Sequence, residues 1–244
     1  MKLLVDIHTH TTASGHAYST ISEYVAHAKK IGLTHFATTD HAPEMPGASG
    51  LFHFFNLDTI PDLWDNIRIY KGIELNILNI EGKVDYPTAR LEALDLRIAS
   101  LHPPCIKPAS KEENTLATIN AMKNPLIHII GHPGAPAYPI DIPQVVKWAV
   151  DTGTYLEINN KSLEPGSIRD DRESVIAIAK ECKRVGHPVV CGTDAHIHFD
   201  LANFDRCVTL LKEIDMPEEL VLNTNIKKFE VALGLKGHQS DYQS

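Results

Sequence analysis

Short apolar runs alternate with longer amphipathic segments along the whole chain. The apolar runs are rich in β-branched and aliphatic residues and predict seven strands, at about residues 2–7, 34–39, 67–73, 95–100, 127–131, 154–159 and 188–193. Helices are expected in the intervals between them. Regular β-then-α alternation predicts parallel strands joined by right-handed crossovers, either closed as a barrel or open as a doubly wound sheet.

Several helix boundaries carry specific signals. Thr20 and Glu23 form a T-x-x-E capping box, and Asp141 precedes I-P-Q-V-V, with proline in the first turn of the expected helix. Gly32 and Gly186 stand where two helices should stop. Further helices are expected at about residues 172–185, 200–214, 217–221 and 226–233.

Each predicted strand is followed by a polar residue able to meet a metal ion or a substrate. After the first strand, His8 and His10 stand two residues apart, so they point the same way on an extended chain, and His16 follows in the loop. The later strands lead into Asp40 and His41, Glu74, His102, His132, Asn159 and Asn160, and Asp194 with His196. A lone H-x-H is often a surface pair or a hydrogen-bonded core pair, but repetition of the design favours a metal site.

The same pattern decides between the two architectures. An open sheet concentrates its site at one switch point, whereas seven contributing strand ends need a ring. The length of 244 residues suits one α/β barrel, so residues 1–244 are expected to form a single domain. No G-x-G-x-x-G or G-x-x-x-x-G-K-[ST] motif is present, so neither a dinucleotide nor a P-loop nucleotide is indicated.

Composition mainly excludes other classes of protein. No apolar run approaches the roughly 20 residues of a membrane span, and M-K-L-L-V-D-I is expected to be a first strand rather than a signal peptide. The four cysteines lack C-x-x-C spacing, as is typical of reduced thiols, and a cytoplasmic location is expected. The formal net charge of -8 argues against a nucleic-acid-binding surface.

Six ordered motifs, H-T-H, T-T-D-H, G-I-E, S-L-H, G-H-P and G-T-D-A-H, resemble those of the polymerase and histidinol phosphatase (PHP) family. The resemblance covers nearly the whole chain and is closest to the small stand-alone bacterial members regarded as phosphatases. It implies an α/β fold, a distorted (β/α)7 TIM-like barrel, with three metal ions at the carboxyl ends of the strands. Grouped by ion, the implied ligands are His8, His10, Glu74 and Asp194; Glu74, His102 and His132; and His16, His41 and His196.

The expected chemistry follows from that ligand set. Imidazole and carboxylate suit zinc, manganese or iron, with zinc the first choice. Two ions sharing Glu74 would hold a bridging hydroxide, because bound cations lower the pKa of water toward about 7. The natural use is hydrolysis of a small phosphorylated substrate. Glu74, Asp194, His196 and Asp40 are the expected catalytic residues; for Asp40, fixing an imidazole and capping the strand end both stay open.

Two other functions stay open as alternatives. One is a 3'-5' exonuclease or phosphodiesterase acting on nucleic acid, against which the length and the negative charge speak. The other is a metal-dependent hydrolase acting on an amide or a ring carbonyl, disfavoured by three metal clusters and by the lack of a carbamylated lysine at a strand end. The sequence does not set the oligomeric state, and a homo-oligomer stays open.

The remaining histidines, His27, His35, His128, His187 and His238, are expected to be structural or solvated, whereas His53 and His198 stay open. Residues 42–56 form a long loop that is either a substrate wall or lid, or simply packs its phenylalanines into the barrel rim. Lys161, Arg169 and Arg172 follow the sixth strand. For each of them a solvated side chain is favoured over a phosphate ligand.

Overall fold

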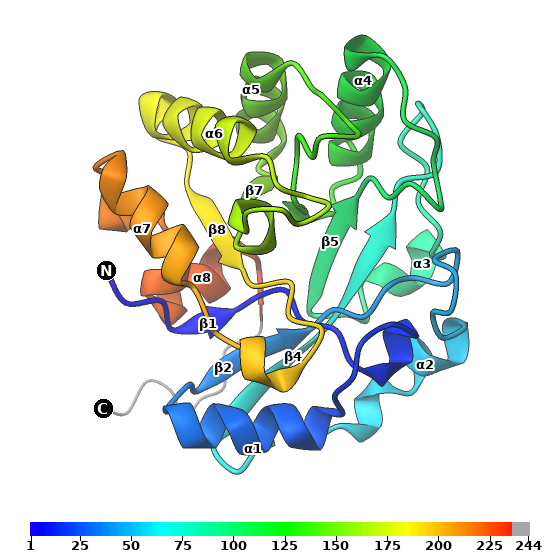
Figure 1. Ribbon diagram of the computed structural model, residues 1–244. Helices are drawn as coiled ribbons and strands as arrows, with labels where there is room; N and C mark the ends of the chain where they lie inside the picture. Colours follow the sequence, from blue (N-terminus) through cyan, green and yellow to red (C-terminus); the bar gives the residue numbers. More distant parts are fainter. Residues whose placement is uncertain (236–244) are drawn as a thin grey trace.

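The computed structural model describes residues 1–235, and its centre is a nearly closed barrel of seven parallel strands with helices outside it (Figure 1). Around the ring the strands follow one another in chain order: β1 (Val5–Asp6), β2 (His35–Thr38), β4 (Ile67–Asn76), β5 (Leu96–Ser100), β6 (Ile129–Ile130), β7 (Tyr155–Asn159) and β8 (Val189–Gly192). The seven predicted strands and the choice of a barrel are therefore confirmed.

One further strand was not predicted. The two-residue strand β3 (Leu63–Trp64) pairs antiparallel with the start of β4. Its two residues stand between Asp62 and Asp65, so no run of apolar residues marks it. Strand β4 is also longer than predicted, so Glu74 lies inside it rather than after it.

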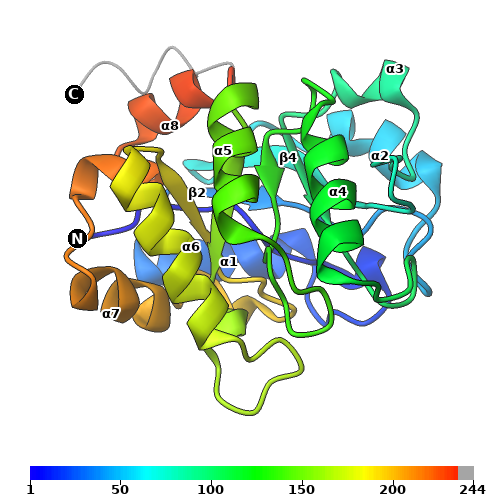
Figure 2. The same ribbon diagram turned by 90° about the horizontal axis from the view of Figure 1, so that it is seen from above.

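The helices lie outside the ring, and α4, α5 and α6 run side by side along one flank of the barrel (Figure 2). The eight are α1 (Ile21–Ile31), α2 (Leu51–Phe55), α3 (Thr88–Leu91), α4 (Lys111–Met122), α5 (Ile142–Thr152), α6 (Arg172–Val185), α7 (Asp205–Glu213) and α8 (Ile226–Ala232). The helix expected at 217–221 is only a three-residue 3-10 turn, Glu218–Leu220.

The predicted helix boundaries are confirmed. Thr20 and Glu23 form a complete capping box at the start of α1, and the Asp141 side chain accepts from the backbone N–H of Gln144 at the start of α5. Gly32 and Gly186 end α1 and α6 with φ of 72° and 71°, a conformation that a residue with a Cβ rarely adopts.

The ring closes between β1 and β8 through side chains rather than a continuous ladder. The carboxamide of Asn223, fully buried, donates to the carbonyls of Val5 and Cys191 at 2.9 and 2.8 Å and accepts from the N–H of Cys191 at 2.7 Å. Asp6 accepts from the backbone N–H and the hydroxyl of Thr193. These contacts bring the first and last strands together, so residues 8–10 and 194–196 share one end of the barrel.

Apolar packing leaves the other end of the barrel closed. Side chains of β1, β5, β6 and β8 form a buried cluster with Phe229 and Leu233, so α8 and the residue after it cover the amino-terminal ends of the strands. A second, larger cluster fills the space between the ring and the outer helices. In the described part of the chain, no helix has both the length and the apolar character to cross a bilayer. All four cysteines are free.

Candidate metal centre

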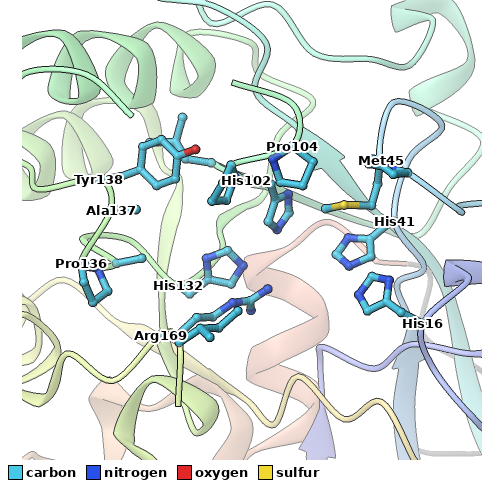
Figure 3. Close-up of a pocket in the computed structure, with 15 residues that line it drawn as sticks. His16, His41, Met45, His102, Pro104, His132, Pro136, Ala137, Tyr138 and Arg169 are labelled. Carbon is cyan, nitrogen blue, oxygen red and sulfur yellow. The ribbon is translucent and has the colours of Figure 1, made fainter. Parts of the chain in front are cut away.

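The nine predicted ligands converge at the carboxyl ends of the strands. The ring of His10 lies 5.0 Å from that of His8, 4.3 Å from that of His41 and 4.4 Å from that of His196, centroid to centroid. The ring of His102 lies 5.0 Å from His41 and 5.2 Å from His132. Figure 3 shows how His16, His41, His102 and His132 are grouped around one cavity.

Glu74 stands at the centre of this group and is fully buried. Its Oε1 atom lies 3.0 Å from Nε2 of His132, 3.3 Å from Nε2 of His102 and 3.4 Å from Nε2 of His8. Its Oε2 atom lies 2.7 Å from Nδ1 of His41 and 3.5 Å from Nε2 of His10. One buried carboxylate thus lies within 3.5 Å of imidazole nitrogens from all of these histidines, including His8 and His10 on one side and His102 and His132 on the other.

Many polar atoms that line this centre are buried and make no hydrogen bond of normal geometry within the protein, even where another polar atom lies close. They are Nε2 of His8, His10 and His102, both ring nitrogens of His41, Oε2 of Glu74 and Oδ1 of Asp194. A native protein normally leaves few such atoms, because each costs about 1–3 kcal/mol when unsatisfied. Their concentration at one place fits the donor set of bound metal ions.

Three subsets bring their ligand atoms within 4.8 Å of one another: His8, His10 and Asp194; His10, His41 and His196; and His41, Glu74 and His102. His16 lies beside the second subset, its ring 5.0 Å from that of His41 and 4.9 Å from that of His196. His132 adjoins the third through Glu74. All nine predicted residues are thus brought together.

Hydrogen bonds from behind orient three of the imidazoles. Nδ1 of His8 lies 2.8 Å from Oε1 of Glu157, and Nδ1 of His102 lies 2.7 Å from Oδ1 of Asn76. Because these partners accept, each Nδ1 carries a proton, and each Nε2 faces the centre as the nitrogen that the neutral imidazole would offer to a metal ion. Neither Glu157 nor Asn76 was predicted, although Glu157 stands two residues before Asn159 and so shares its face of the strand.

Asp40 acts on the third imidazole indirectly. Its carboxylate accepts from the hydroxyls of Ser14 and Thr11, at 2.7 and 2.8 Å, and from the N–H of Thr11. Since Ser14 gives its proton to Asp40, its oxygen accepts from Nδ1 of His10 at 3.1 Å. Both roles left open for Asp40 are therefore present: it fixes an imidazole through Ser14 and ties down the turn after β1. No described contact joins its side chain to the centre itself.

The protonation states suit metal binding. Burial opposes ionisation of Glu74, but His102, His8 and His41 outweigh it and hold the pKa of that carboxyl well below its ordinary value. Burial lowers the pKa of His102 to about 3, and burial together with His41 and His196 lowers the pKa of His10. For His8, burial is outweighed by Glu157, Glu74 and Asp194, which raise the pKa. Ionised carboxylates and neutral imidazoles are the forms that ligate metals, and Glu74, His10 and His102 favour these forms. The three carboxylates around His8 instead favour a positive charge there, which a bound cation would supply in place of the proton.

The backbone at two ligand positions is unusual for residues other than glycine. Asp194 has φ of 57° and His132 φ of 28°. Such conformations persist where the surrounding structure enforces them, commonly at functional sites. Gly192 has a related role, since a Cβ there would lie 2.1 Å from Oε1 of Glu157. Its lack of a side chain allows Glu157 to approach His8.

Two strand-end residues do not reach the centre, contrary to the prediction. The carboxamide of Asn159 donates to Glu157 and accepts from the N–H of Ser162, and Asn160 accepts from the N–H of Cys207. Both are used to hold β7 and the segment after it. The residue of β7 that does contact a predicted ligand is Glu157, through His8.

The other polar residues considered in the sequence analysis differ in whether they lie beside the centre. Arg169 pairs with Asp194 beside the centre, so the prediction of a solvated side chain is wrong for it. The guanidinium of Arg172 is exposed and pairs with Glu213. Lys161, also exposed, pairs with Glu164 at 2.9 Å. The four histidines expected to be structural or solvated that the structure describes, His27, His35, His128 and His187, lie outside the centre; His238 lies outside the described residues.

Two histidines had been left open. Nε2 of His53 lies 3.3 Å from Oδ2 of Asp40, behind the centre. His198 contacts Ser19 through its Nδ1, at 2.8 Å from the hydroxyl oxygen. Neither is among the residues that form the metal-ligand subsets described above.

Two hollows flank the centre. The first, about 430 Å³, is reached by His41, His102 and His132 and is otherwise lined mainly by proline, alanine and other apolar side chains (Figure 3). The second, about 510 Å³, is reached by Asp194 and His196 and is lined by polar residues that include Lys161, Glu164 and Ser167. His16, Ile168 and Arg169 border both hollows.

The segment 42–56, predicted as a loop, contains the helix α2, and its first part supplies a wall of the first hollow through Met45 and Pro46. Its aromatic residues divide: Phe54 is 3% exposed and packs against Tyr86, whereas Phe52 is 85% exposed. The prediction that the phenylalanines pack into the barrel rim is therefore confirmed for Phe54 and wrong for Phe52. Phe55 is partly exposed, with the guanidinium of Arg90 over its ring.

Comparison with known proteins gives the family. The model of the PHP domain matches residues 6–161 of the chain. This chain belongs to the PHP domain family. A probable phosphatase of Acetivibrio thermocellus is 47% identical over 230 residues, 94% of this chain and 95% of its own length. One of Caldanaerobacter subterraneus is 48% identical over 229 residues, 93% and 90% of the two chains.

Solved structures of this family and beyond share the fold. The histidinol phosphate phosphatase of Lactococcus lactis, solved with zinc, L-histidinol and phosphate, superposes with a TM-score of 0.61 at 18% identity, over 88% of this chain and 94% of its own. A chain of an archaeal ribonuclease P with mature tRNA gives a TM-score of 0.57 at 12% identity, over 94% and 90% of the chains. At such identities the likeness concerns the fold alone.

Proposed function

We propose that this PHP domain protein is a metal-dependent phosphatase that hydrolyses small phosphate esters at a three-metal site. The observation that carries the proposal is the position of Glu74, with one oxygen among His8, His102 and His132 and the other beside His10 and His41. Relatives that match over nearly their full length are named probable phosphatases, which supports the reaction class.

The ligands would divide among three ions as the family resemblance implies. His8, His10, Glu74 and Asp194 would hold one ion; Glu74, His102 and His132 a second; and His16, His41 and His196 the third. Nitrogen and oxygen donors without thiolate suit zinc first and manganese or iron next. When bound, such ions draw charge from phosphoryl oxygens and acidify water.

The chain's own residues would bind and orient the ester. Arg169 borders both hollows, is 17% exposed and carries a guanidinium whose planar fork matches two phosphate oxygens. The guanidinium is paired with Asp194, which keeps it beside the centre. A phosphate bound there would compete with the Asp194 carboxylate for this guanidinium. The walls above the histidines would keep bulk water from the ester bond.

Hydrolysis of nucleic acid is the alternative, because the fold is also found in a ribonuclease P chain. The formal net charge of -8 opposes binding of a long polyanion. Lys161, which lines the second hollow, is paired with Glu164. The centre therefore favours a single small phosphate ester over a strand of phosphodiesters.

The test is a screen of protein of measured metal content against phosphomonoesters, phosphodiesters and single-stranded oligonucleotides at neutral to mildly alkaline pH. Turnover of phosphomonoesters above the other two classes is expected. Preferential cleavage of oligonucleotides would replace this function with the nuclease alternative. Fully metal-loaded protein that hydrolyses no ester in the panel would contradict the proposal altogether.

A further inference from the structure

The first hollow differs from the rest of the site in the kind of group it can receive. Its floor is made by His41, His102 and His132, and no aspartate or glutamate is among the described residues that line it. Arg169, at its border, is its one lysine or arginine among those residues. A positively charged group bound there would find no carboxylate among these residues and would lose its hydrating water, so its free energy of binding would be less favourable.

The walls are apolar and stiff. Four prolines, Pro46, Pro103, Pro104 and Pro136, line the hollow, and their fixed φ limits how far the walls can move. The ring of Tyr138 also lines it, and the hydroxyl donates its proton to the carbonyl of Ile106 at 2.5 Å, so it has no proton left to donate to a ligand. A preformed apolar wall binds a flat or branched apolar group with little loss of conformational entropy.

The second hollow is lined by side chains of a different kind. It carries Lys161 paired with Glu164, and the side chain of Ser167, beside Asp194 and His196. The two hollows meet at His16, Ile168 and Arg169, the residues that border both. A phosphate at the centre therefore has a hollow with apolar walls on the side of His102 and His132 and one that carries a lysine and a glutamate on the side of His196.

We infer that the preferred substrates are phosphate monoesters of uncharged, apolar or aromatic alcohols, whose leaving group sits in the first hollow. This inference rests on the proposed phosphatase function and narrows its substrate class. Esters of amino alcohols should be poor substrates, because the hollow supplies no carboxylate for the ammonium group. Burial of a phenyl group against the prolines should raise kcat/KM by at least about tenfold.

The experiment compares alkyl phosphates, so that the chemistry of the leaving oxygen stays similar: 2-phenylethyl phosphate, glycerol 1-phosphate and 2-aminoethyl phosphate. The matching phosphonates, 2-phenylethylphosphonate and 2-aminoethylphosphonate, cannot be hydrolysed, and calorimetry with them reports binding alone. Metal-loaded protein should favour the phenyl compound in both assays. Equal or reversed preference with good turnover would overturn the inference and leave the phosphatase function standing.

Two substitutions at one residue test whether the substrate preference arises in the first hollow. Ala137 is exposed and lines the first hollow but contacts none of the predicted ligands through a described interaction. Ala137→Asp adds a carboxylate and should lower the preference for phenyl over aminoethyl by about tenfold, whereas Ala137→Asn has nearly the same shape and should change it little. An unchanged preference in Ala137→Asp would place the leaving group elsewhere and overturn the inference. Absence of turnover with every monoester would overturn the inference and the function together.

Discussion

Oε1 of Glu157 lies 2.8 Å from Nδ1 of His8, and both side chains are completely buried. The other oxygen of the same carboxylate accepts from the backbone N–H of His132 and the carboxamide of Asn159, at 2.7 and 3.1 Å. One carboxylate inside β7 therefore fixes two residues of the centre, the side chain of His8 after β1 and the backbone of His132 after β6. Partners of this kind set the tautomer and the basicity of a ligating imidazole.

Glu157→Gln should weaken metal binding by about 10–100-fold with little loss of fold. The amide has one acceptor oxygen and one donor group in place of two acceptor oxygens, so it cannot satisfy His8, His132 and Asn159 at once. Chelator competition measures the metal affinity, and circular dichroism checks the fold. The control is Glu213→Gln, at an exposed ion pair with Arg172. Equal metal affinity in wild type and Glu157→Gln would show that Glu157 does not position His8.

Arg169→Ala should lower kcat/KM for phosphate esters by about 10–100-fold, the effect of losing a charge-assisted hydrogen bond to phosphate. Arg172→Ala is the matched control, because that guanidinium is exposed and pairs with Glu213 away from the hollows. Steady-state kinetics on both variants gives the comparison. If the two substitutions had the same small effect, Arg169 would not bind the substrate.

Asn223→Ala should lower the free energy of unfolding by about 3 kcal/mol. The substitution leaves the buried N–H of Cys191 and the carbonyls of Val5 and Cys191 without partners, and each unsatisfied group costs about 1–3 kcal/mol. Urea unfolding of the metal-free protein measures the difference. Asn225→Ala, which removes only the cap of α8, should cost about 1 kcal/mol. A smaller loss in Asn223→Ala than in Asn225→Ala would contradict the role assigned to Asn223 in closing the barrel.

Acid should destabilise the fold through His128. Burial and the neighbouring Arg97 lower the pKa of His128 from 6.5 to about 3, and its Nε2 accepts from that guanidinium. The unfolded chain therefore binds a proton that the folded chain rejects, so this stabilisation is complete above pH 6.5 and is lost as the pH falls toward 3. The slope should reach about 1.4 kcal/mol per pH unit. His128→Gln, compared with wild type by urea unfolding at several pH values, should flatten this dependence; identical slopes would show that His128 is protonated equally in both states.

The sequence predicted the strand order and the gathering of the ligands because both depend on local patterns. An apolar run followed by a histidine or carboxylate is visible residue by residue, and the closed ring brings all such strand ends together. Strand β3 was not predicted because aspartates flank its two residues, whereas the equally short β1 and β6 lie within longer apolar runs. Asn159 and Asn160 were misjudged because strand-end position alone does not say whether a side chain turns toward the centre or back to the backbone.

The residues that position the ligands were harder to predict. Ser14, Asn76 and Glu157 act through contacts with residues 4, 26 and 149 positions away in the chain, and only the folded structure supplies those pairings. Glu157 did leave a signal, a carboxylate in the middle of an otherwise apolar strand. A charge at such a position needs a buried partner, which here is His8.

The central claim is that Glu74 joins two ions within a three-metal site, and elemental analysis tests it most directly. Protein purified without chelator should carry about three transition-metal ions per chain, and Glu74→Gln should lose metal and fall in activity by orders of magnitude with its secondary structure intact. His16→Ala and His196→Ala, at the ion without Glu74, should be less damaging. At most one ion per chain after reconstitution, or full metal content and near-normal turnover in Glu74→Gln, would contradict the account.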